Sequence, residues 1–112
     1  MRIAALTALM MVVLGGFGSV ALAADPVETK LTIENNKFSP EELKVKANTP
    51  FVIVVTNKDK TPEEFESKEL KIEKVIPPGQ TVKVRVRALK PGTDNFVGDY
   101  HQATAKGRII AE

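Results

Sequence analysis

The segment Phe51-Val52-Ile53-Val54-Val55-Thr56 decides the fold of this 112-residue chain. It is the strongest strand signal in the chain, with apolar side chains on both faces of an extended strand, so the strand needs cover from two sides. Asn48-Thr49-Pro50 and the polar residues 57–62 are turn and loop signals that bound it. We therefore predict that residues 51–56 form a central strand of the hydrophobic core.

The segments around this strand alternate polar and apolar residues, as half-buried strands do. Such segments are predicted at residues 30–34, 43–46, 70–76, 81–87, 94–97 and 106–111. Pro77-Pro78-Gly79 and Pro91-Gly92 are firm turns, and Ser39-Pro40-Glu41-Glu42 is too short to be a helix. About seven short strands without a helix predict an all-β fold, an antiparallel Greek-key β-sandwich.

The amino-terminal 23 residues have the form of a secretory signal peptide. Arg2 provides a positive start, residues 3–20 are almost wholly apolar or small, and Ala21-Leu22-Ala23 has the small-x-small form of a cleavage site. An uncleaved membrane anchor is the alternative. We predict removal of residues 1–23, a single domain at residues 24–112, and a periplasmic location.

Composition excludes several classes of function. The 16 Lys and Arg residues nearly balance the 14 Asp and Glu residues, so nucleic acid is not an expected partner. The chain has no Cys, which excludes disulfides and a thiolate copper site, and all three Met residues lie in the predicted signal peptide. A metal would therefore be held by carboxylates, carbonyls, water and the single histidine. A hydrolase is not expected either, because no Ser has a base beside it other than His101.

Two polar clusters could bind a metal together. In an extended segment, Glu64 and Glu66 point to one face and Phe65 to the other. His101, the only histidine, follows Asp99 in the loop GDYHQATAKG, so it could supply a nitrogen ligand. Carboxylates with one imidazole suit Fe, Mn or Cu(II) better than Cu(I). The alternative is that these glutamates are solvated or paired with nearby lysines.

The framework of the chain resembles that of the cupredoxins. The resemblance lies in Phe38-Ser39-Pro40, the Asn57-Lys58-Asp59 strand ending, the turns at 77–80 and 89–92, and Gly107-Arg108-Ile109-Ile110. It implies that His101 matches the second histidine ligand of a blue-copper site and that Glu63 or Glu64 stands near the first. No residue matches the cysteine, and Ala105 stands where methionine is common, so blue-copper electron transfer is not implied.

A narrower resemblance is to the periplasmic cupredoxin-like proteins of bacterial iron-uptake systems, similar to the cupredoxin domain of EfeO-type proteins. It rests on residues 62–67, on residues 70–78, on Asp99-Tyr100-His101 and on Ala105-Lys106-Gly107. It implies binding of copper or iron, support for the oxidation and uptake of ferrous iron, and an Ftr1-type iron permease as partner. The implied metal ligands are Glu64, Glu66, Asp99 and His101, with Glu63 and Glu73 as second choices.

A metal-free β-sandwich that docks on a membrane transporter is the competing hypothesis. It predicts that the carboxylates scatter over the surface, whereas the metal hypothesis predicts that they converge with His101. Exposed edge strands would also allow a homodimer, although nothing in the sequence specifies one.

Overall fold

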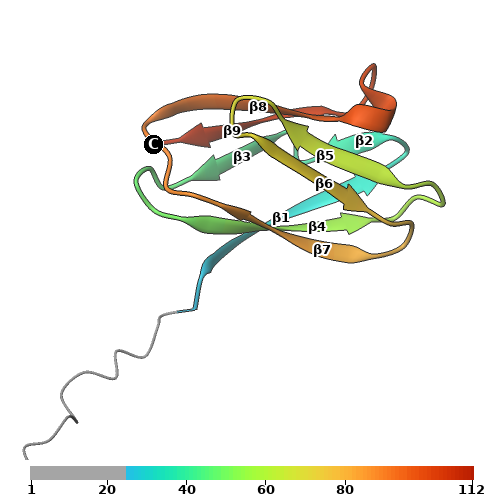
Figure 1. Ribbon diagram of the computed structural model, residues 1–112, viewed down its shortest axis with the longest axis horizontal. Coiled ribbons are helices and arrows are strands. Elements are labelled where there is room, and N and C mark those ends of the chain that lie inside the picture. The colour runs from blue at the N-terminus through green and yellow to red at the C-terminus, as the bar shows by residue number, and fades with distance from the viewer. Residues whose placement is uncertain (1–24) are drawn as a thin grey trace, which may run out of the picture.

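Two stacked sheets make up the protein (Figure 1). The computed structural model describes residues 25–112, so the predicted signal peptide lies outside the described residues. Strands account for most of the described chain: β1 (Val27–Glu34), β2 (Lys37–Ser39), β3 (Glu42–Val45), β4 (Phe51–Asn57), β5 (Glu63–Ser67), β6 (Ile72–Ile76), β7 (Thr81–Val86), β8 (Gly92–Gly98) and β9 (Lys106–Ala111). The all-β sandwich predicted from the sequence is confirmed.

Strand β4 lies inside the four-stranded sheet, whose order is β2-β1-β4-β7. Its inward side chains Phe51, Ile53 and Val55 are buried, and even the outward Val52 is only 8 % exposed. The prediction of a central core strand at this position is therefore confirmed. The second sheet has the order β3-β9-β8-β5-β6 and carries the acidic and histidine-containing segments.

The pairing of strands is mixed rather than wholly antiparallel. β1 runs parallel to β4, with Val27 opposite Phe51, and β3 runs parallel to β9, with Glu42 opposite Arg108. All other strand pairs are antiparallel. Alternation of polar and apolar residues specifies which face of a strand is buried but not the direction of its neighbour. For these two pairs the expected antiparallel arrangement is therefore corrected.

Three phenylalanines from different strands form the centre of the core beneath the second sheet. Phe38 meets Phe65 and Phe96 edge-on, with ring centroids 6.2 and 5.0 Å apart, and Phe65 stacks on Phe96 at 4.9 Å. Phe96 lies opposite Gly107 in the β8–β9 register, and a Cβ atom at Gly107 would overlap the Phe96 ring. This packing holds β5 and β8 side by side, so it positions the acidic residues on both strands.

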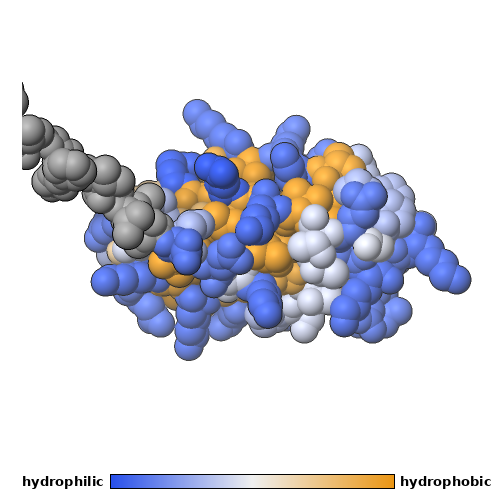
Figure 2. All heavy atoms as spheres, turned by 90° about the horizontal axis from the view of Figure 1, so that it is seen from below, coloured by the Kyte–Doolittle hydropathy of each residue, from blue (hydrophilic) through white to orange (hydrophobic). Residues whose placement is uncertain are grey.

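The outer face of the four-stranded sheet is covered by long polar side chains. Figure 2, the view from below Figure 1, shows hydrophilic side chains projecting above hydrophobic surface. In the sheet register Val52 lies between Glu28 and Arg85, and the ammonium of Lys83 pairs with Glu28 at 3.1 Å. Such side chains cover apolar surface with their stems while their charges remain in water. Within residues 25–112, no helix has the length and apolar character needed to span a membrane.

Candidate metal centre

Strand β5 directs its glutamates to two different faces of the sheet. Glu63, Phe65 and Ser67 alternate along the inner face and are each at most 1 % exposed. Glu64 and Glu66 occupy the outer face, because successive side chains of a strand point to opposite sides. The predicted common face for Glu64 and Glu66, with Phe65 buried on the other, is therefore confirmed.

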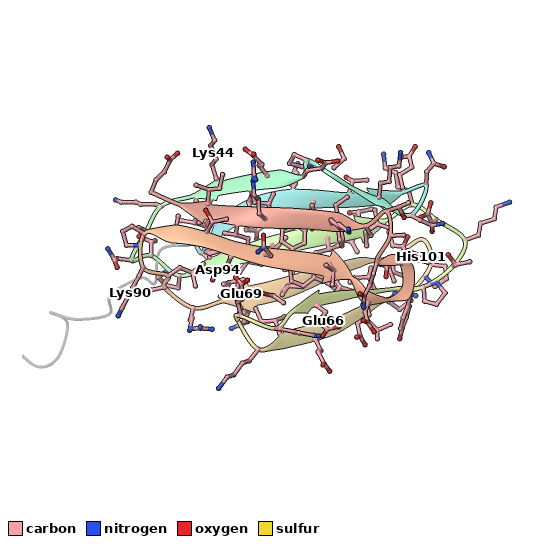
Figure 3. All side chains as sticks on the ribbon, turned by 90° about the horizontal axis from the view of Figure 1, so that it is seen from above. Lys44, Glu66, Glu69, Lys90, Asp94 and His101 are labelled. Carbon is pink, nitrogen blue, oxygen red and sulfur yellow. The ribbon has the colours of Figure 1, made fainter. Side chains whose placement is uncertain are left out.

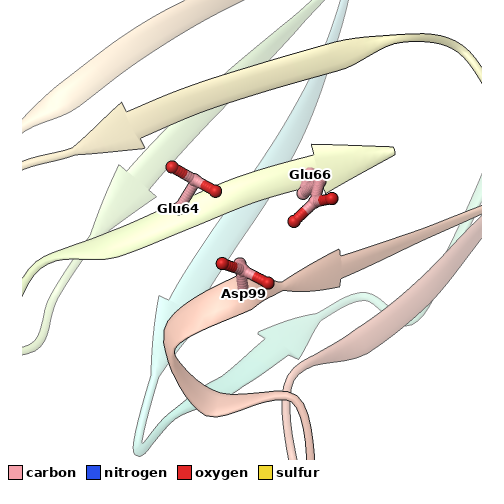
Figure 4. A group of neighbouring side chains, drawn as sticks. All are labelled: Glu64, Glu66 and Asp99. Atoms are coloured by element: carbon pink, nitrogen blue, oxygen red, sulfur yellow. The ribbon is translucent and has the colours of Figure 1, made fainter. Parts of the chain in front are cut away.

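Asp99 reaches the same outer face from the turn that directly follows the neighbouring strand β8. β5 and β8 are antiparallel, with Phe65 opposite Gly98 and Glu66 opposite Val97, so the residue after Gly98 comes beside Glu64. Asp99 begins a single 3₁₀ turn, η2 (Asp99–His101). One carboxylate oxygen from each of Glu64, Glu66 and Asp99 can be chosen so that all three lie within 4.8 Å of one another (Figure 4). We call these three residues the acidic cluster.

The acidic cluster has no salt-bridge partner within residues 25–112, although the charge of Lys68 partly offsets the raised pKa of Glu66. The four ion pairs within residues 25–112 involve other carboxylates, so the lysines near β5 do not form salt bridges with the cluster. Burial, followed by the charges of Asp99 and Glu73, raises the pKa of Glu64. Burial and the hydrogen bond with Asp99 raise the pKa of Glu66. The site therefore disfavours its own ionisation and would be stabilised by a cation.

Glu73 lies opposite Glu66 in the β5–β6 register. Its side chain is exposed, and it is not among the described residues whose ligand atoms lie within 4.8 Å of the other cluster oxygens. Its charge nevertheless contributes to the raised pKa of both Glu64 and Glu66. Glu73 therefore strengthens the negative potential at the cluster from the adjacent edge strand.

His101 contacts a different carboxylate from those in the cluster. Its Nδ1 lies 2.6 Å from Oε2 of the buried Glu63, and Oε1 of Glu63 accepts hydrogen bonds from the backbone amides of Glu64 and Tyr100, each at 3.0 Å. Figure 3 places Glu66 and His101 away from Lys44 and Lys90, which lie toward the opposite end of the sandwich. The structure thus groups the proposed ligands as a three-carboxylate cluster and a Glu63–His101 pair.

The Glu63–His101 pair is the feature that the sequence reasoning missed. The strand alternation that sends Glu64 outward also sends Glu63 inward beside Phe65. A buried carboxylate requires hydrogen-bond donors, and the single histidine is the side chain that supplies one here. The sequence signal for this pair was the strand position of Glu63, which predicts an inward-facing carboxylate that needs a hydrogen-bond donor inside the protein.

The raised pKa values predict how pH affects the metal-free protein. A carboxyl group whose pKa is higher in the folded than in the unfolded state contributes stability that is complete below the unfolded pKa and is lost as pH rises through the folded pKa. Glu64 and Glu66 should therefore lower the melting temperature as pH rises from about 4.5 toward neutrality. Thermal melts in the presence of a chelator should show a smaller decline for the double variant E64Q/E66Q. Parallel curves for variant and wild type would contradict this expectation.

Residues 5–111 match a family described as a cupredoxin-like domain. The chain belongs to the cupredoxin-like family. A relative in Rickettsia prowazekii, described as the uncharacterized protein RP394, is 40 % identical over 84 residues, which are 75 % of this chain and 67 % of the relative. The family match confirms the framework resemblance found in the sequence.

Solved structures with the same fold include copper proteins. Auracyanin A, a blue copper protein of Chloroflexus aurantiacus, aligns with a TM-score of 0.65 at 15 % identity, covering 78 % of this chain and 99 % of auracyanin. The metal-binding domain of a Cu(I)-exporting P-type ATPase, CopA, from Streptococcus pneumoniae aligns with a TM-score of 0.67 at 14 % identity, covering 80 % and 89 %. At these identities the likeness establishes the shared fold.

The donor atoms of this cupredoxin-like protein do not fit a thiolate copper centre. The chain contains no Cys, and its Met residues all lie among the first 11 positions. At the carboxyl-terminal loop, Nδ1 of His101 is engaged by Glu63. The acidic cluster instead offers three carboxylates, the donor type that hard cations prefer. Chemistry that depends on a Cu–thiolate bond is therefore excluded for this chain.

Proposed function

We propose that this cupredoxin-like protein binds a copper or iron cation at the acidic cluster and supports bacterial iron uptake. The observation that carries the proposal is the convergence of Glu64 and Glu66 from β5 with Asp99 from η2, with no salt bridge to any of them within residues 25–112. Mutual repulsion of three carboxylates costs free energy in the absence of a cation. A bound cation would remove that cost and form strong interactions with the oxygens.

The charge of the cluster also favours one class of cation over another. When all three are ionised, the carboxylates are hard ligands with a combined formal charge of −3, which suits Fe and Cu(II) and disfavours Cu(I). Among the oxidation states of iron, the ferric ion gains more from such a site because its charge is higher. This preference is the contribution that the protein would make to the oxidation and uptake of ferrous iron.

Titration of the chelator-treated protein with Cu²⁺, and with Fe²⁺ under anaerobic conditions, tests the binding step. A cation that binds only the folded state adds about 2.7 kcal/mol of stability at a hundred times its dissociation constant. For a domain of this size, that gain corresponds to an increase of about 10–20 °C in melting temperature. Calorimetry should detect saturable binding of one cation. The absence of both heat and thermal shift with either metal would refute a cation site.

The partner in this proposal is an Ftr1-type iron permease, and the compartment is the periplasm. Support comes from the resemblance of residues 62–67 and of Asp99-Tyr100-His101 to the cupredoxin-like proteins of iron-uptake systems. The predicted signal peptide at residues 1–23 is consistent with export. A soluble protein that holds iron beside a permease would raise the local concentration of the transported ion.

Cellular iron uptake tests this role directly. In a strain that lacks the gene, accumulation of radioactive iron under iron limitation should fall, and the wild-type gene should restore it. A gene carrying E64Q/E66Q should restore little uptake, whereas E28Q, which alters a carboxylate on the other sheet, should restore it fully. If the E64Q/E66Q gene restored iron uptake as fully as the wild-type gene, the cluster would have no role in iron uptake.

Docking on a transporter without a metal is the competing function, and one observation favours it. Val75 and Tyr100 are exposed by 45 % and 49 %, and they neighbour the cluster through Glu64 and Asp99. Exposed large apolar side chains beside a charged site are typical of a contact surface. The substitutions V75S and Y100S would reduce iron uptake under either hypothesis, so they do not discriminate. Loss of both iron uptake and metal binding in E64Q/E66Q would support the cation role.

A further inference from the structure

We propose that Glu63 is a positioning residue for the cation site: its buried carboxylate fixes the spacing between the ligands Glu64 and Asp99. This inference rests on the proposed function, because it concerns how the cation ligands are held. Glu63 itself is 1 % exposed and faces the interior, so it acts on the cation through its neighbours. The arrangement resembles the outer-shell hydrogen bonds that orient metal ligands in other proteins.

The contacts of Glu63 join the two strands that carry the ligands. Oε1 accepts the backbone N–H of Glu64, the residue that is itself a cluster member, at 3.0 Å. The same oxygen accepts the backbone N–H of Tyr100, the residue directly after Asp99, at 3.0 Å. One oxygen atom therefore ties the start of β5 to the η2 turn. Because each amide is at or next to a ligand, displacement of Glu63 would change the distance between the Glu64 and Asp99 carboxylates.

The second oxygen of Glu63 orients the imidazole of His101. A carboxylate has only acceptors, so the 2.6 Å contact between Oε2 and Nδ1 requires the proton on Nδ1. The backbone of the same turn is closed by the His101 carbonyl, which accepts the amide of Ala105 at 2.8 Å. His101 therefore makes both contacts: its side chain binds Glu63, and its backbone carbonyl closes the η2 loop.

Gly98 makes this close approach sterically feasible. A Cβ atom at position 98 would lie 2.6 Å from Cδ of Glu63 and 2.7 Å from Cβ of Ala105, far inside van der Waals contact. Any side chain at this position would push the Glu63 carboxyl group away from the backbone N–H groups that donate hydrogen bonds to it. Gly98 is therefore a second, independent position at which the spacing of the ligands can be perturbed.

The test compares the Cu²⁺ affinities of variants of the full domain by calorimetry. E63A and G98A should each weaken binding by about tenfold or more, the usual effect of removing an outer-shell partner. E63Q should lose less affinity than E63A, because its amide oxygen still accepts both backbone N–H groups while its NH₂ group no longer matches Nδ1–H of His101. V84A, a buried substitution in the opposite sheet, should lower the melting temperature yet leave the affinity unchanged.

Several results would overturn the inference. The first is that G98A binds the metal as tightly as wild type does. The second is that E63Q loses as much affinity as E63A, and the third is that V84A loses a comparable amount. G98A provides the decisive measurement if E63A does not fold. No binding by the wild type would refute the proposed function itself, which distinguishes that failure from this one.

Discussion

Replacing all three cluster carboxylates by amides, in the variant E64Q/E66Q/D99N, should abolish saturable cation binding and raise the melting temperature of the metal-free protein. The two effects have one cause. Burial, together with the negative charge of neighbouring carboxylates, raises the pKa of Glu64 and Glu66, and either a cation or neutral side chains would remove the cost of ionising them. Amides keep the size and shape of the acids, so packing should be unchanged. Calorimetric titration and thermal melts with a chelator measure the two effects separately.

A matched triple variant distinguishes the cluster from general surface charge. E28Q/E34Q/E42Q removes the same formal charge from three carboxylates that each pair with Lys or Arg. We expect this variant to bind Cu²⁺ as wild type does and to have an equal or lower melting temperature, because it loses ion pairs. If both triple variants lost binding, long-range attraction rather than the cluster would account for the affinity.

The variant F65A should cost about 3–5 kcal/mol of folding free energy, a large part of the stability of a small domain. Phe65 is fully buried, stacks on Phe96 and meets Phe38 edge-on. Its loss would leave a cavity beneath β5. Because Phe65 lies between Glu64 and Glu66 in the sequence, the backbone that carries both glutamates would lose its support. We therefore expect a sharp fall in the denaturant midpoint together with weaker cation binding.

Val27 offers the comparison for this core substitution. It is 57 % exposed at the start of β1, so V27A should change stability by less than about 0.5 kcal/mol. Urea unfolding followed by circular dichroism measures both variants. A midpoint for F65A within experimental error of V27A would mean that the phenylalanine cluster does not hold the second sheet in place.

The strands were predictable from sequence because burial on this sandwich follows a local rule. Phe51, Ile53 and Val55 had to face the core, and the alternation of Val82, Val84 and Val86 specified the same for β7. The direction of pairing was not predictable. The parallel contact of β1 with β4 depends on how the chain returns through β2 and β3, and no local pattern encodes that path.

The candidate site was predictable only in part for a related reason. Strand periodicity placed Glu64 and Glu66 together, and the sequence also suggested Asp99 as their companion. The role of His101 depended on the burial of Glu63, which is a tertiary property. Once Glu63 faces the interior, it competes for the only imidazole and holds Nδ1. A ligand set inferred from residue type alone does not account for such competition.

The parallel pairing of β3 with β9 has a consequence for how the protein is made. Residues 42–45 find their partners only at residues 108–111, so the five-stranded sheet stays incomplete until the ribosome has added those residues. Contacts this distant along the chain slow folding. The second sheet would therefore stay open, with β3 unpaired on this side, until residues 108–111 reach it.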